Sequence, residues 1–353
     1  MVMDKSFWYG KKVLITGHTG FKGAWLSLLL TRLGANVTGF SLDSLGEKTV
    51  FEVSGVKANI SDIRGDIRNI DSLRKVFKEC RPEVVFHLAA QPFVLYSYDY
   101  PIETYETNVI GTLNVLEAIR ETNTTVATVV VTSDKCYDNK EWEWGYREND
   151  PMGGYDPYSS SKACVELLVS SYRNSYKQGN HSAIASVRAG NVIGGGDWGL
   201  NRLIPDIVNA FTVRAPVIVR HPNAIRPWQH VLEPLMGYSL LAQHMCLKGE
   251  SFAEAWNFGP VASDAKSVKW IIEESASLWG KGASWSVDKD ASLHEACYLR
   301  LDSSKANSKL DWYPRWDVQT ALSKTIDWYS QQIKSADMRL VSEAQIDEYM
   351  SCF

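Results

Sequence analysis

The stretch KVLITGHTGFKGAWLSLLLTRLG, residues 12–34, decides the fold. Residues 12–16 are a short, mostly apolar run, which is typical of a strand buried on both faces of a sheet. Glycines follow at positions 17, 20 and 23, and residues 24–33 then have a helical pattern that ends at Gly34. A strand, a glycine-rich turn and a helix in this order predict the phosphate-binding turn of a dinucleotide-binding fold.

The three glycines of this turn have separate predicted purposes. Gly17 permits a tight turn, Gly20 lets backbone amides approach a pyrophosphate, and Gly23 allows the helix to pack closely on the strand. The helix N-terminus that follows favours the phosphate charge. The spacing GxxGxxG also occurs in plain tight turns, so the flanking strand and helix are what favour a dinucleotide.

Strand-like and helical segments alternate through the first half of the chain. Further strands are expected at 36–41, 83–88, 127–132 and 183–188, and helices at 71–80, 102–121 and 158–176. This alternation predicts an α/β protein with a Rossmann-type, doubly wound parallel sheet.

The alternation stops near residue 190, which predicts a smaller α+β lobe for the substrate. A later helical segment should pack back on the sheet, so the two lobes are interleaved in sequence. We assign residues 1–188 and the returning segment 228–262 to the dinucleotide-binding lobe. Residues 189–227 and 263–353 form the substrate lobe and a C-terminal tail.

The composition excludes several classes of protein. The 353 residues include 37 Lys and Arg against 41 Asp and Glu, so we expect no cationic surface for nucleic acid or for a membrane. The longest apolar stretch, residues 25–33, is far shorter than the roughly 20 residues of a membrane span, and the first residues lack the pattern of a signal peptide.

The six cysteines predict a compartment. They stand at positions 80, 136, 164, 246, 297 and 352, form no CxxC pair and have no histidines at zinc spacing. This pattern indicates free thiols, a cytoplasmic location and no metal site.

The residues that point to catalysis follow the fourth strand and open the next helix. Tyr158 and Lys162 are four residues apart, on one helix face. A lysine ammonium lowers the pKa of a nearby phenol, which makes it a base for a carbohydrate hydroxyl. Ser133, Asp134 and Lys135 end the strand, where such sheets place their chemistry. An ordinary solvated pair and ordinary turn residues are the alternative interpretation.

These motifs resemble the extended short-chain dehydrogenase/reductase family. The matching segments are GxxGxxG at 17–23, HLAA at 87–90 and YxxxK at 158–162, and, for the nucleotide-sugar branch, RAGNV at 188–192, RPWQHV at 226–231 and NFGP at 257–260. The resemblance covers the chain to about residue 330 and implies NAD as the cofactor.

Within that branch the chain resembles the CDP-glucose 4,6-dehydratases. The matching runs are SDKCYDNKEW at 133–142, GGYDPYSSSKA at 153–163, RAGNVIGGGDW at 188–198 and AIRPWQHVLEPL at 224–235. The resemblance implies CDP-glucose as the substrate and CDP-4-keto-6-deoxyglucose as the product. That product feeds the 3,6-dideoxyhexoses of bacterial O-antigen.

The resemblance also implies catalytic roles. Tyr158, assisted by Ser133 and Lys162, takes the proton of the sugar 4-hydroxyl while hydride leaves C4 for the nicotinamide; the hydride later returns to C6. Asp134 is the expected acid for the departing 6-hydroxyl. Relatives commonly carry Glu where this chain has Lys135. Either Lys135 is the C5 base, with a pKa lowered by burial or by a neighbouring cation, or it only holds a water or another base.

The remaining expected site residues divide between cofactor and substrate. Those expected at NAD are Gly17, Thr19, Gly20, Phe21, Lys22, Gly23, Ser41, Leu42, Asp66, Ile67, Leu88, Ala89, Ala90, Asn108, Thr132, Tyr158, Lys162 and Arg188. Those expected at the sugar nucleotide are Gln91, Asn191, Arg202, Leu203, Arg226, Trp228 and Tyr298. The two substrate arginines suit a diphosphate, whereas a Trp is more often packed in a core. Ser41 stands where an acidic residue usually selects NAD, so the second strand does not itself separate NAD from NADP.

Other functions remain open on the residues alone. A nucleotide-sugar 4-epimerase or decarboxylase needs Tyr158 and Lys162 but no acid–base pair for C5 and C6. A redox-sensing regulator would bind NAD(P) without catalysis, and a purely structural protein would not need the glycine turn. The long helices at 102–121 and 158–176 predict a homodimer or homotetramer, as in relatives.

Overall fold

Seven parallel strands form the central sheet, in the order β11-β6-β5-β4-β1-β2-β3. Their bounds are β1 (Lys12–Thr16), β2 (Asn36–Ser41), β3 (Ser61–Arg64), β4 (Val84–His87), β5 (Ala127–Val131), β6 (Ala183–Ala189) and β11 (Ala255–Phe258). The chain runs outward from β1 to β3, then returns to β4 on the other side of β1. Sheets of this kind bind ligands at the carboxyl ends of the strands where the order reverses, here β1 and β4. The computed structural model describes residues 4–176, 182–280, 282–287 and 298–352.

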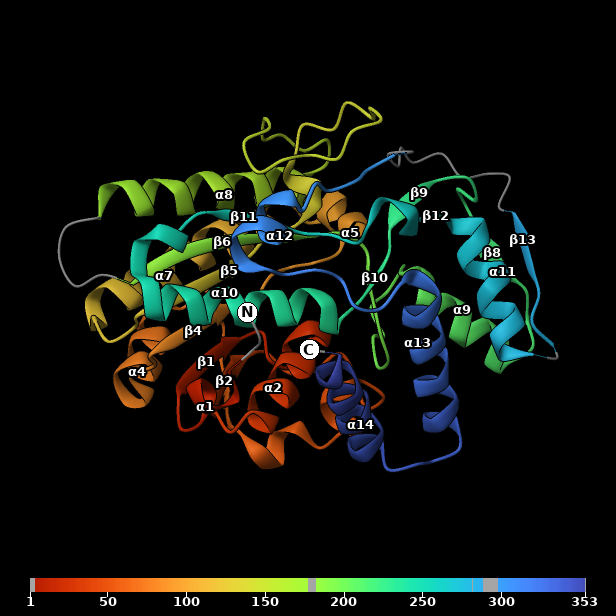
Figure 1. The fold of residues 1–353 in the computed structure, drawn as a ribbon, viewed down its shortest axis with the longest axis horizontal. Helices are drawn as coiled ribbons and strands as arrows, with labels where there is room; N and C mark the ends of the chain where they lie inside the picture. The colour runs from red at the N-terminus through yellow and green to blue at the C-terminus, as the bar shows by residue number, and fades with distance from the viewer. Residues whose placement is uncertain (1–3, 177–181, 281, 288–297, 353) are drawn as a thin grey trace.

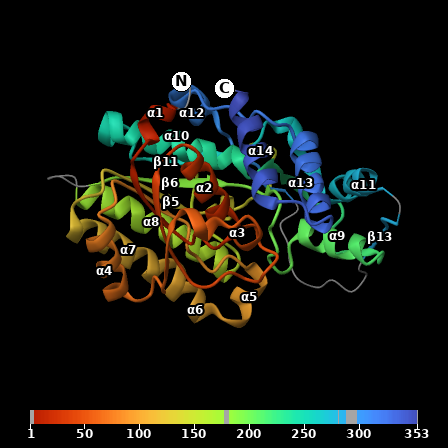
Figure 2. The ribbon, with the colours of Figure 1, turned by 90° about the horizontal axis from the view of Figure 1, so that it is seen from below.

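Helices cover both faces of this sheet (Figure 1, Figure 2). One face carries α2 (Phe21–Arg32) and α10 (Leu232–Lys248), and the other carries α4 (Ile70–Cys80), α7 (Gly111–Thr122) and α8 (Pro157–Ser175). Within β1, Val13 and Ile15 belong to the core under the first face, and Leu14 belongs to the core under the second. Apolar side chains on both sides of a strand are what a doubly covered parallel sheet requires. The predicted fold class is confirmed.

The strands with predicted bounds all form, within one residue of those bounds at each end. The first helix begins three residues earlier than expected, at Phe21, because Gly20 is its N-cap residue. The glycine turn is therefore shorter than the sequence pattern suggested, and Phe21 and Lys22 belong to the first helical turn.

The helix predicted at 102–121 is interrupted. It consists of α6 (Pro101–Tyr105), a π-helical turn η2 (Glu106–Ile110) and α7. The wider turn contains Asn108, which is buried and bonds two other segments. Its Oδ1 accepts from the backbone N–H of Gln91 at 2.8 Å, and its Nδ2 donates to Ser161 Oγ at 2.8 Å. Periodicity did not show this turn, since the apolar pattern continues through it.

The other described elements are short sheets, helices and turns. The two-stranded sheets are β7 (Val192–Ile193) with β10 (Gln229–His230), β9 (Ile225–Pro227) with β12 (Ala265–Ser267), and β8 (Val217–Val219) with β13 (Trp285–Val287). The helices and turns are α1 (Lys5–Trp8), α3 (Val50–Val53), α5 (Val94–Asp99), α9 (Leu203–Thr212), α11 (Val268–Trp279), α12 (Ser304–Leu310), α13 (Val318–Ile333), α14 (Met338–Ser351), η1 (Val56–Asn59), η3 (Asp134–Cys136), η4 (Gly249–Phe252) and η5 (Ala262–Asp264). Elements α9, β8, α11 and β13 lie together at one end of the molecule, on the right in Figure 1. Strand β11 joins the central sheet from within the segment 228–262; the division into lobes stays a prediction.

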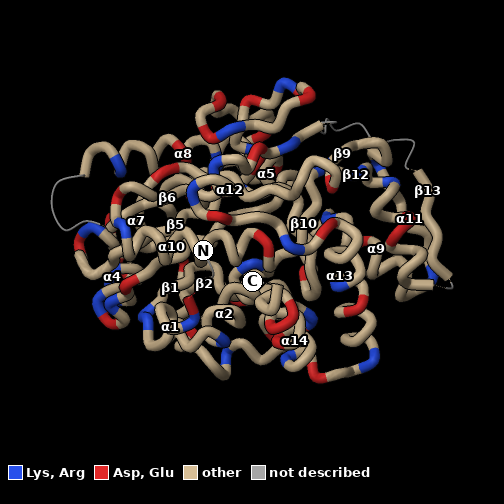
Figure 3. Tube along the Cα trace, viewed as in Figure 1, with Lys and Arg blue, Asp and Glu red and all other residues tan. Residues whose placement is uncertain are grey.

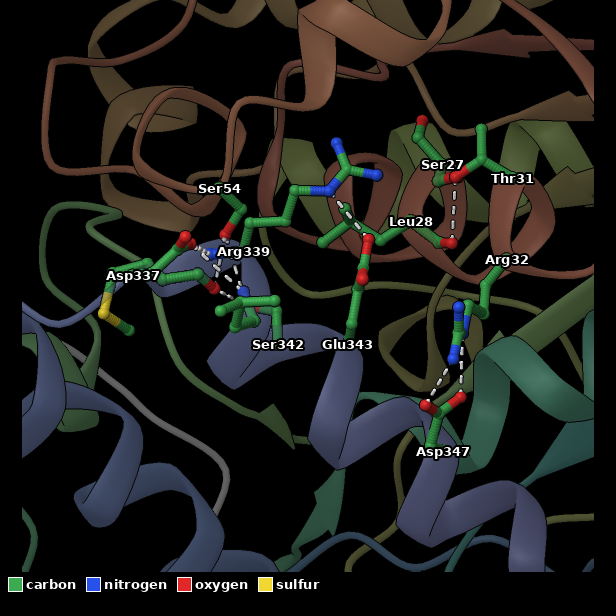
Figure 4. Close-up of polar contacts among 12 residues, drawn as sticks. Ser27, Leu28, Thr31, Arg32, Ser54, Asp337, Arg339, Ser342, Glu343 and Asp347 are labelled. Carbon is green, nitrogen blue, oxygen red and sulfur yellow. Dashed lines mark hydrogen bonds and ion pairs between the residues drawn. The ribbon is translucent and has the colours of Figure 1, made fainter.

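The last helix, α14, packs beside α2 through polar contacts (Figure 4). Arg32 of α2 forms a two-pronged ion pair with Asp347, with Nε and Nη2 at 2.9 and 2.7 Å from the carboxylate oxygens. Within α14, Arg339 pairs with Glu343 at 2.7 Å. Basic and acidic residues are interspersed over the tube in Figure 3. Among the described residues, no helix combines the length and the apolar character that crossing a bilayer demands.

Candidate active site

The glycine turn after β1 is pressed against the end of β4. Gly17 has a φ of +76°, and a Cβ built on it would lie 2.6 Å from the backbone nitrogen of Ala89. A Cβ on Gly23 would lie 2.1 Å from the carbonyl oxygen of Gly17. Both positions therefore need glycine. The turn and the segment Leu88–Ala90, all expected at the cofactor, are thus side by side at the carboxyl edge of the sheet.

The N-terminus of α2 carries no acidic residue to balance its partial positive charge. Its N-cap is Gly20, which has no side chain to cap the first amides, and its first turn contains Lys22. Burial and the charge of Arg202 lower the pKa of Lys22 to about 8, while Asp134 and Asp197 act in the opposite direction. Uncapped amides and a lysine at a helix N-terminus together favour an anionic ligand.

Polar contacts tie the glycine turn to the end of β2. Thr19 Oγ1 lies 2.8 Å from Ser41 Oγ and donates to the carbonyl of Leu42 at 3.0 Å. Asp66 instead accepts three hydrogen bonds from Arg68, and the buried side chain of Ile67 packs in the core. Both residues are expected at NAD, but the side chain of Ile67 is buried in the core.

The structure brings Ser133, Asp134, Tyr158 and Lys162 together, and all four are buried. Ser133 ends the extended segment after β5, and its hydroxyl accepts from the N–H of Lys135 at 3.2 Å, which caps η3. The same hydroxyl donates to Asp134 Oδ1 at 3.1 Å and is hydrogen-bonded to Tyr158. Lys162 donates from Nζ to the carbonyl of Val131 at 3.3 Å, which places the ammonium under the end of β5.

Burial changes the proton affinity of each of these groups. It raises the pKa of Tyr158 to about 12, although the Ser133 hydrogen bond lowers it. Burial also raises the pKa of Asp134, against the lowering effect of Lys135, Ser133, Lys22 and Arg226. Burial and the charge of Lys22 lower the pKa of Lys162 to about 8. The site thus holds a carboxyl that resists ionisation beside a phenol that does the same.

Lys135 differs from its neighbours because its side chain is exposed. Burial, one of the two conditions for a lysine base, is therefore not met in this structure. Asp134 Oδ2, by contrast, is buried without a hydrogen-bond partner among the described residues. The hydrogen-bonding capacity of that oxygen is therefore unused.

The residues expected at the sugar nucleotide fall into two groups: Arg202, Arg226, Asn191, Leu203 and Tyr298, and the two inward-facing residues Gln91 and Trp228. Arg202, at the N-cap of α9 before Leu203, donates from Nη1 to both Asp197 oxygens at 2.9 Å. Arg226 lies in β9 next to Ile225, which pairs with Tyr298 in an isolated bridge, and Asn191 follows β6 and is half-buried. The second group faces inward: Trp228 is buried and donates to the carbonyl of Lys266 at 2.9 Å, and the amide of Gln91 donates to Thr104 and Phe93.

The side chains of Arg188 and Thr132 both bond Glu166. The Arg188 guanidinium forms an ion pair with Glu166, and both side chains are 3% exposed. Thr132 Oγ1 donates to the same carboxylate at 2.5 Å. Glu166 is the charged partner that the buried guanidinium of Arg188 needs, and the contact of Arg188 and Thr132 with the cofactor stays a prediction.

Sequence reasoning did not single out Glu166, Asp197, Tyr137 or Asn257. Glu166 was detectable, since it follows Tyr158 and Lys162 at the same four-residue spacing. Nothing in the sequence alone pairs Asp197 with Arg202, because that pair depends on the turn at Gly199.

Comparison with known proteins identifies the family of the chain. The family model described as GDP-mannose 4,6 dehydratase matches residues 14–325. The chain is 52% identical to the CDP-glucose 4,6-dehydratase of Salmonella typhimurium, over 99% of both chains. It is 24% identical to the dTDP-glucose 4,6-dehydratase of Haemophilus influenzae, over 90% of this chain and 97% of that one.

Solved structures show the same fold. An epimerase from Methanothermobacter thermautotrophicus superposes with a TM-score of 0.81 at 26% identity, covering 96% of this chain and 98% of that one. The dTDP-glucose 4,6-dehydratase of Bacillus anthracis in complex with NAD gives 0.76 at 22% identity, covering 94% and 100%. The chain belongs to the GDP-mannose 4,6 dehydratase family, within the extended short-chain dehydrogenases/reductases.

Proposed function

We propose that this protein is an NAD-dependent lyase that converts CDP-glucose to CDP-4-keto-6-deoxyglucose, a precursor for 3,6-dideoxyhexoses of the O-antigen. The observation that carries the proposal is the 52% identity, over 99% of both chains, to the Salmonella CDP-glucose 4,6-dehydratase. The dTDP-glucose 4,6-dehydratase of Haemophilus influenzae is about half as similar, so the choice of CDP-glucose rests on the Salmonella match.

The residues at the carboxyl edge of the sheet fit NAD. The tight cradle at Gly17, the uncapped start of α2 and Lys22 suit its pyrophosphate, and Thr19 with Ser41 lies where the adenosine ribose belongs. Bound NAD would accept a hydride from C4 of the hexose and return it to C6. Lys162 would then hold the nicotinamide ribose while its charge faces Tyr158.

The oxidation at C4 requires a base for the 4-hydroxyl. Tyr158 Oη takes that proton, and Ser133 Oγ donates a hydrogen bond to the same sugar oxygen. Because burial raises the pKa of Tyr158 to about 12, the phenolate needs a cation nearby. Lys162, one helical turn away on the same face, supplies it.

The elimination of water requires an acid at C6 and a base at C5. Asp134 is the candidate acid, since its burial raises the pKa of the carboxyl and so favours its protonated form. Lys135 is the candidate base at C5 and stands on the adjoining position of η3. Its exposure means that a bound ligand, and not the fold, would have to desolvate it.

The diphosphate is the natural partner of the two substrate arginines. Arg226 and Tyr298 lie on paired segments, and Arg202 would share its guanidinium between Asp197 and the phosphate. Asn191, Leu203, Gln91 and Trp228 are the other residues proposed at the sugar nucleotide; the side chains of Gln91 and Trp228 bond Thr104 and the carbonyl of Lys266.

We also propose a homodimer or homotetramer working in the cytoplasm. Ile102 is 74% exposed, Leu167 on α8 is 62% exposed, and Ile110 is 48% exposed. Apolar side chains on the outer faces of α6, η2 and α8 suit burial against a second copy. The described cysteines are free thiols, which suits a reducing compartment.

Turnover with CDP-glucose, beside UDP-glucose and dTDP-glucose, tests the function. A 4-keto-6-deoxy product, which absorbs in strong alkali, should form fastest from CDP-glucose. Product from none of the three would refute the proposal, and an epimer without the alkaline absorbance would favour the epimerase alternative.

The assignment of Lys135 has its own test. In deuterated water, Lys135→Ala should bind CDP-glucose but lose the exchange of the C5 proton, whereas Lys140→Ala, an exposed lysine of the same loop, should exchange at the parent rate. Exchange at the parent rate in Lys135→Ala would remove Lys135 from the role of base and leave it to hold a water or another base.

A further inference from the structure

Glu166 lies on α8 one turn after Lys162, and its two oxygens accept four hydrogen bonds. Arg188 donates to Oε1 from Nε at 2.9 Å and to Oε2 from Nη2 at 2.8 Å. Thr132 Oγ1 donates to Oε1 at 2.5 Å, and Ser186 Oγ donates to Oε2 at 2.7 Å. A carboxylate saturated in this way holds its position and its charge.

These bonds reach both flanks of the turn that carries Ser133 and Asp134. Thr132 stands directly before that turn. Directly after it, Tyr137 Oη accepts from Arg188 Nη1 at 2.6 Å and donates to Asn257 Oδ1 at 2.8 Å. The ring of Tyr137 also lies 4.9 Å from the guanidinium carbon of Arg188. The Glu166–Arg188 pair therefore fixes this turn to the helix that bears Tyr158 and Lys162.

The same carboxylate also acts on the charge of Lys162. Tyr158, Lys162 and Glu166 follow one another at four-residue spacing, on one helix face. Burial and Lys22, from α2, lower the pKa of Lys162 to about 8, while Glu166 and Cys136 raise it.

Two further groups belong to this electrostatic environment. His87, at the end of β4, stays neutral, because burial and Lys162 lower its pKa to about 3. Arg173, further along α8, feels the charge of Glu166. Arg188 and the two hydroxyls lower the pKa of Glu166 more than burial raises it, so Glu166 is the permanent anion that faces Lys162.

We propose that Glu166 is a positioning residue for the reaction proposed above: through Arg188 it holds the Ser133–Asp134 turn against α8, and through its charge it keeps Lys162 protonated. The inference rests on the proposed function for its kinetic readout only.

Glu166→Gln tests the proposal through the pH profile of kcat/KM for CDP-glucose. Loss of the anion should lower the pKa of Lys162, so the alkaline limb of the profile should move down by about one pH unit. Activity at pH 8 should fall by about fivefold, because the protonated fraction of Lys162 falls from about one half to about one tenth. Asp347→Asn, which removes an exposed two-pronged partner of Arg32, should leave the limb where it is. A folded Glu166→Gln protein with an unshifted limb overturns the proposal.

Glu166→Gln leaves the guanidinium of Arg188 buried without an anion, which can prevent folding. A second variant therefore keeps the proposal testable. Glu166→Gln combined with Arg188→Gln leaves no uncompensated buried charge. The limb should move in the same direction but by less, because the cation of Arg188 is lost together with the anion; an unshifted limb contradicts the proposal.

The titration of Lys162 can also be followed without turnover. In protein labelled with 13Cε-lysine, its NMR signal is identified by its loss in Lys162→Met. If the parent protein does not act on CDP-glucose, the proposed function fails, while an unshifted Lys162 titration in Glu166→Gln refutes the role of Glu166 separately.

Discussion

The Arg188–Glu166 and Arg32–Asp347 pairs have the same two-pronged geometry in different surroundings. Both place two guanidinium nitrogens within 2.9 Å of two carboxylate oxygens. The side chains of the first pair are 3% exposed, and those of the second are 46% exposed. In the buried pair, water cannot solvate either charge if its partner is lost, whereas in the exposed pair it can solvate both. Identical contacts in a drawing therefore do not imply identical energies.

Breaking the buried pair should have the largest effect. Arg188→Met leaves Glu166 buried without its cation, and we expect a loss of about 3–5 kcal/mol in the free energy of unfolding. Urea denaturation followed by circular dichroism measures it. A loss below about 1 kcal/mol would show that water reaches Glu166 and that the pair behaves like the exposed one.

Glu233 extends the comparison to a buried carboxylate held by neutral donors. It accepts from the backbone N–H groups of Arg315 and Trp316 and from the hydroxyl of Tyr349 on α14. Burial raises the pKa of Glu233 to about 7. The folded protein then binds a proton that the unfolded chain loses near pH 4.5, so this group's contribution to stability is full below pH 4.5 and is lost as the pH rises to about 7.

Glu233→Gln should therefore remove a decrease in stability between pH 4.5 and 7. The free energy of unfolding of the variant, minus that of the parent, should be about 1–3 kcal/mol larger at pH 7.5 than at pH 4.5. Urea midpoints at the two pH values provide the measurement. A parent whose stability rises over this interval, by an amount that Glu233→Gln abolishes, would show that Glu233 is ionised in the fold.

Breaking the exposed pair should have the smallest effect. Asp347→Asn should cost about 0.2–1 kcal/mol at low salt, and most of that difference should vanish near 1 M salt, where charges are screened. Thermal melts at the two salt concentrations test this. A larger, salt-independent loss would mean that α14 contributes to the core in a way that the exposure of Asp347 does not reveal.

The sequence was sufficient for the sheet, because the sheet depends on local patterns. The residues predicted to be catalytic also come from a local pattern, and the structure brings Ser133, Asp134, Tyr158 and Lys162 together. Each of these patterns spans only a few residues: the run at 12–16 with the glycines after it, and the spacing between Tyr158 and Lys162. What was missed depends on contacts between distant segments. Arg188 is one residue in a motif, and only the packing of β6 against α8 shows that it points to Glu166. The inward turn of Ile67 and Trp228 has the same cause.

The π-helical turn at Asn108 sets the angular phase between α6 and α7. One additional residue in a turn rotates all that follows by about 100° relative to a regular helix. Deleting a single residue from η2 would restore regular winding and swing Asn108 away from Gln91 and Ser161. A one-residue deletion there would therefore act like a register shift in a strand, changing which side of a whole helix meets the core.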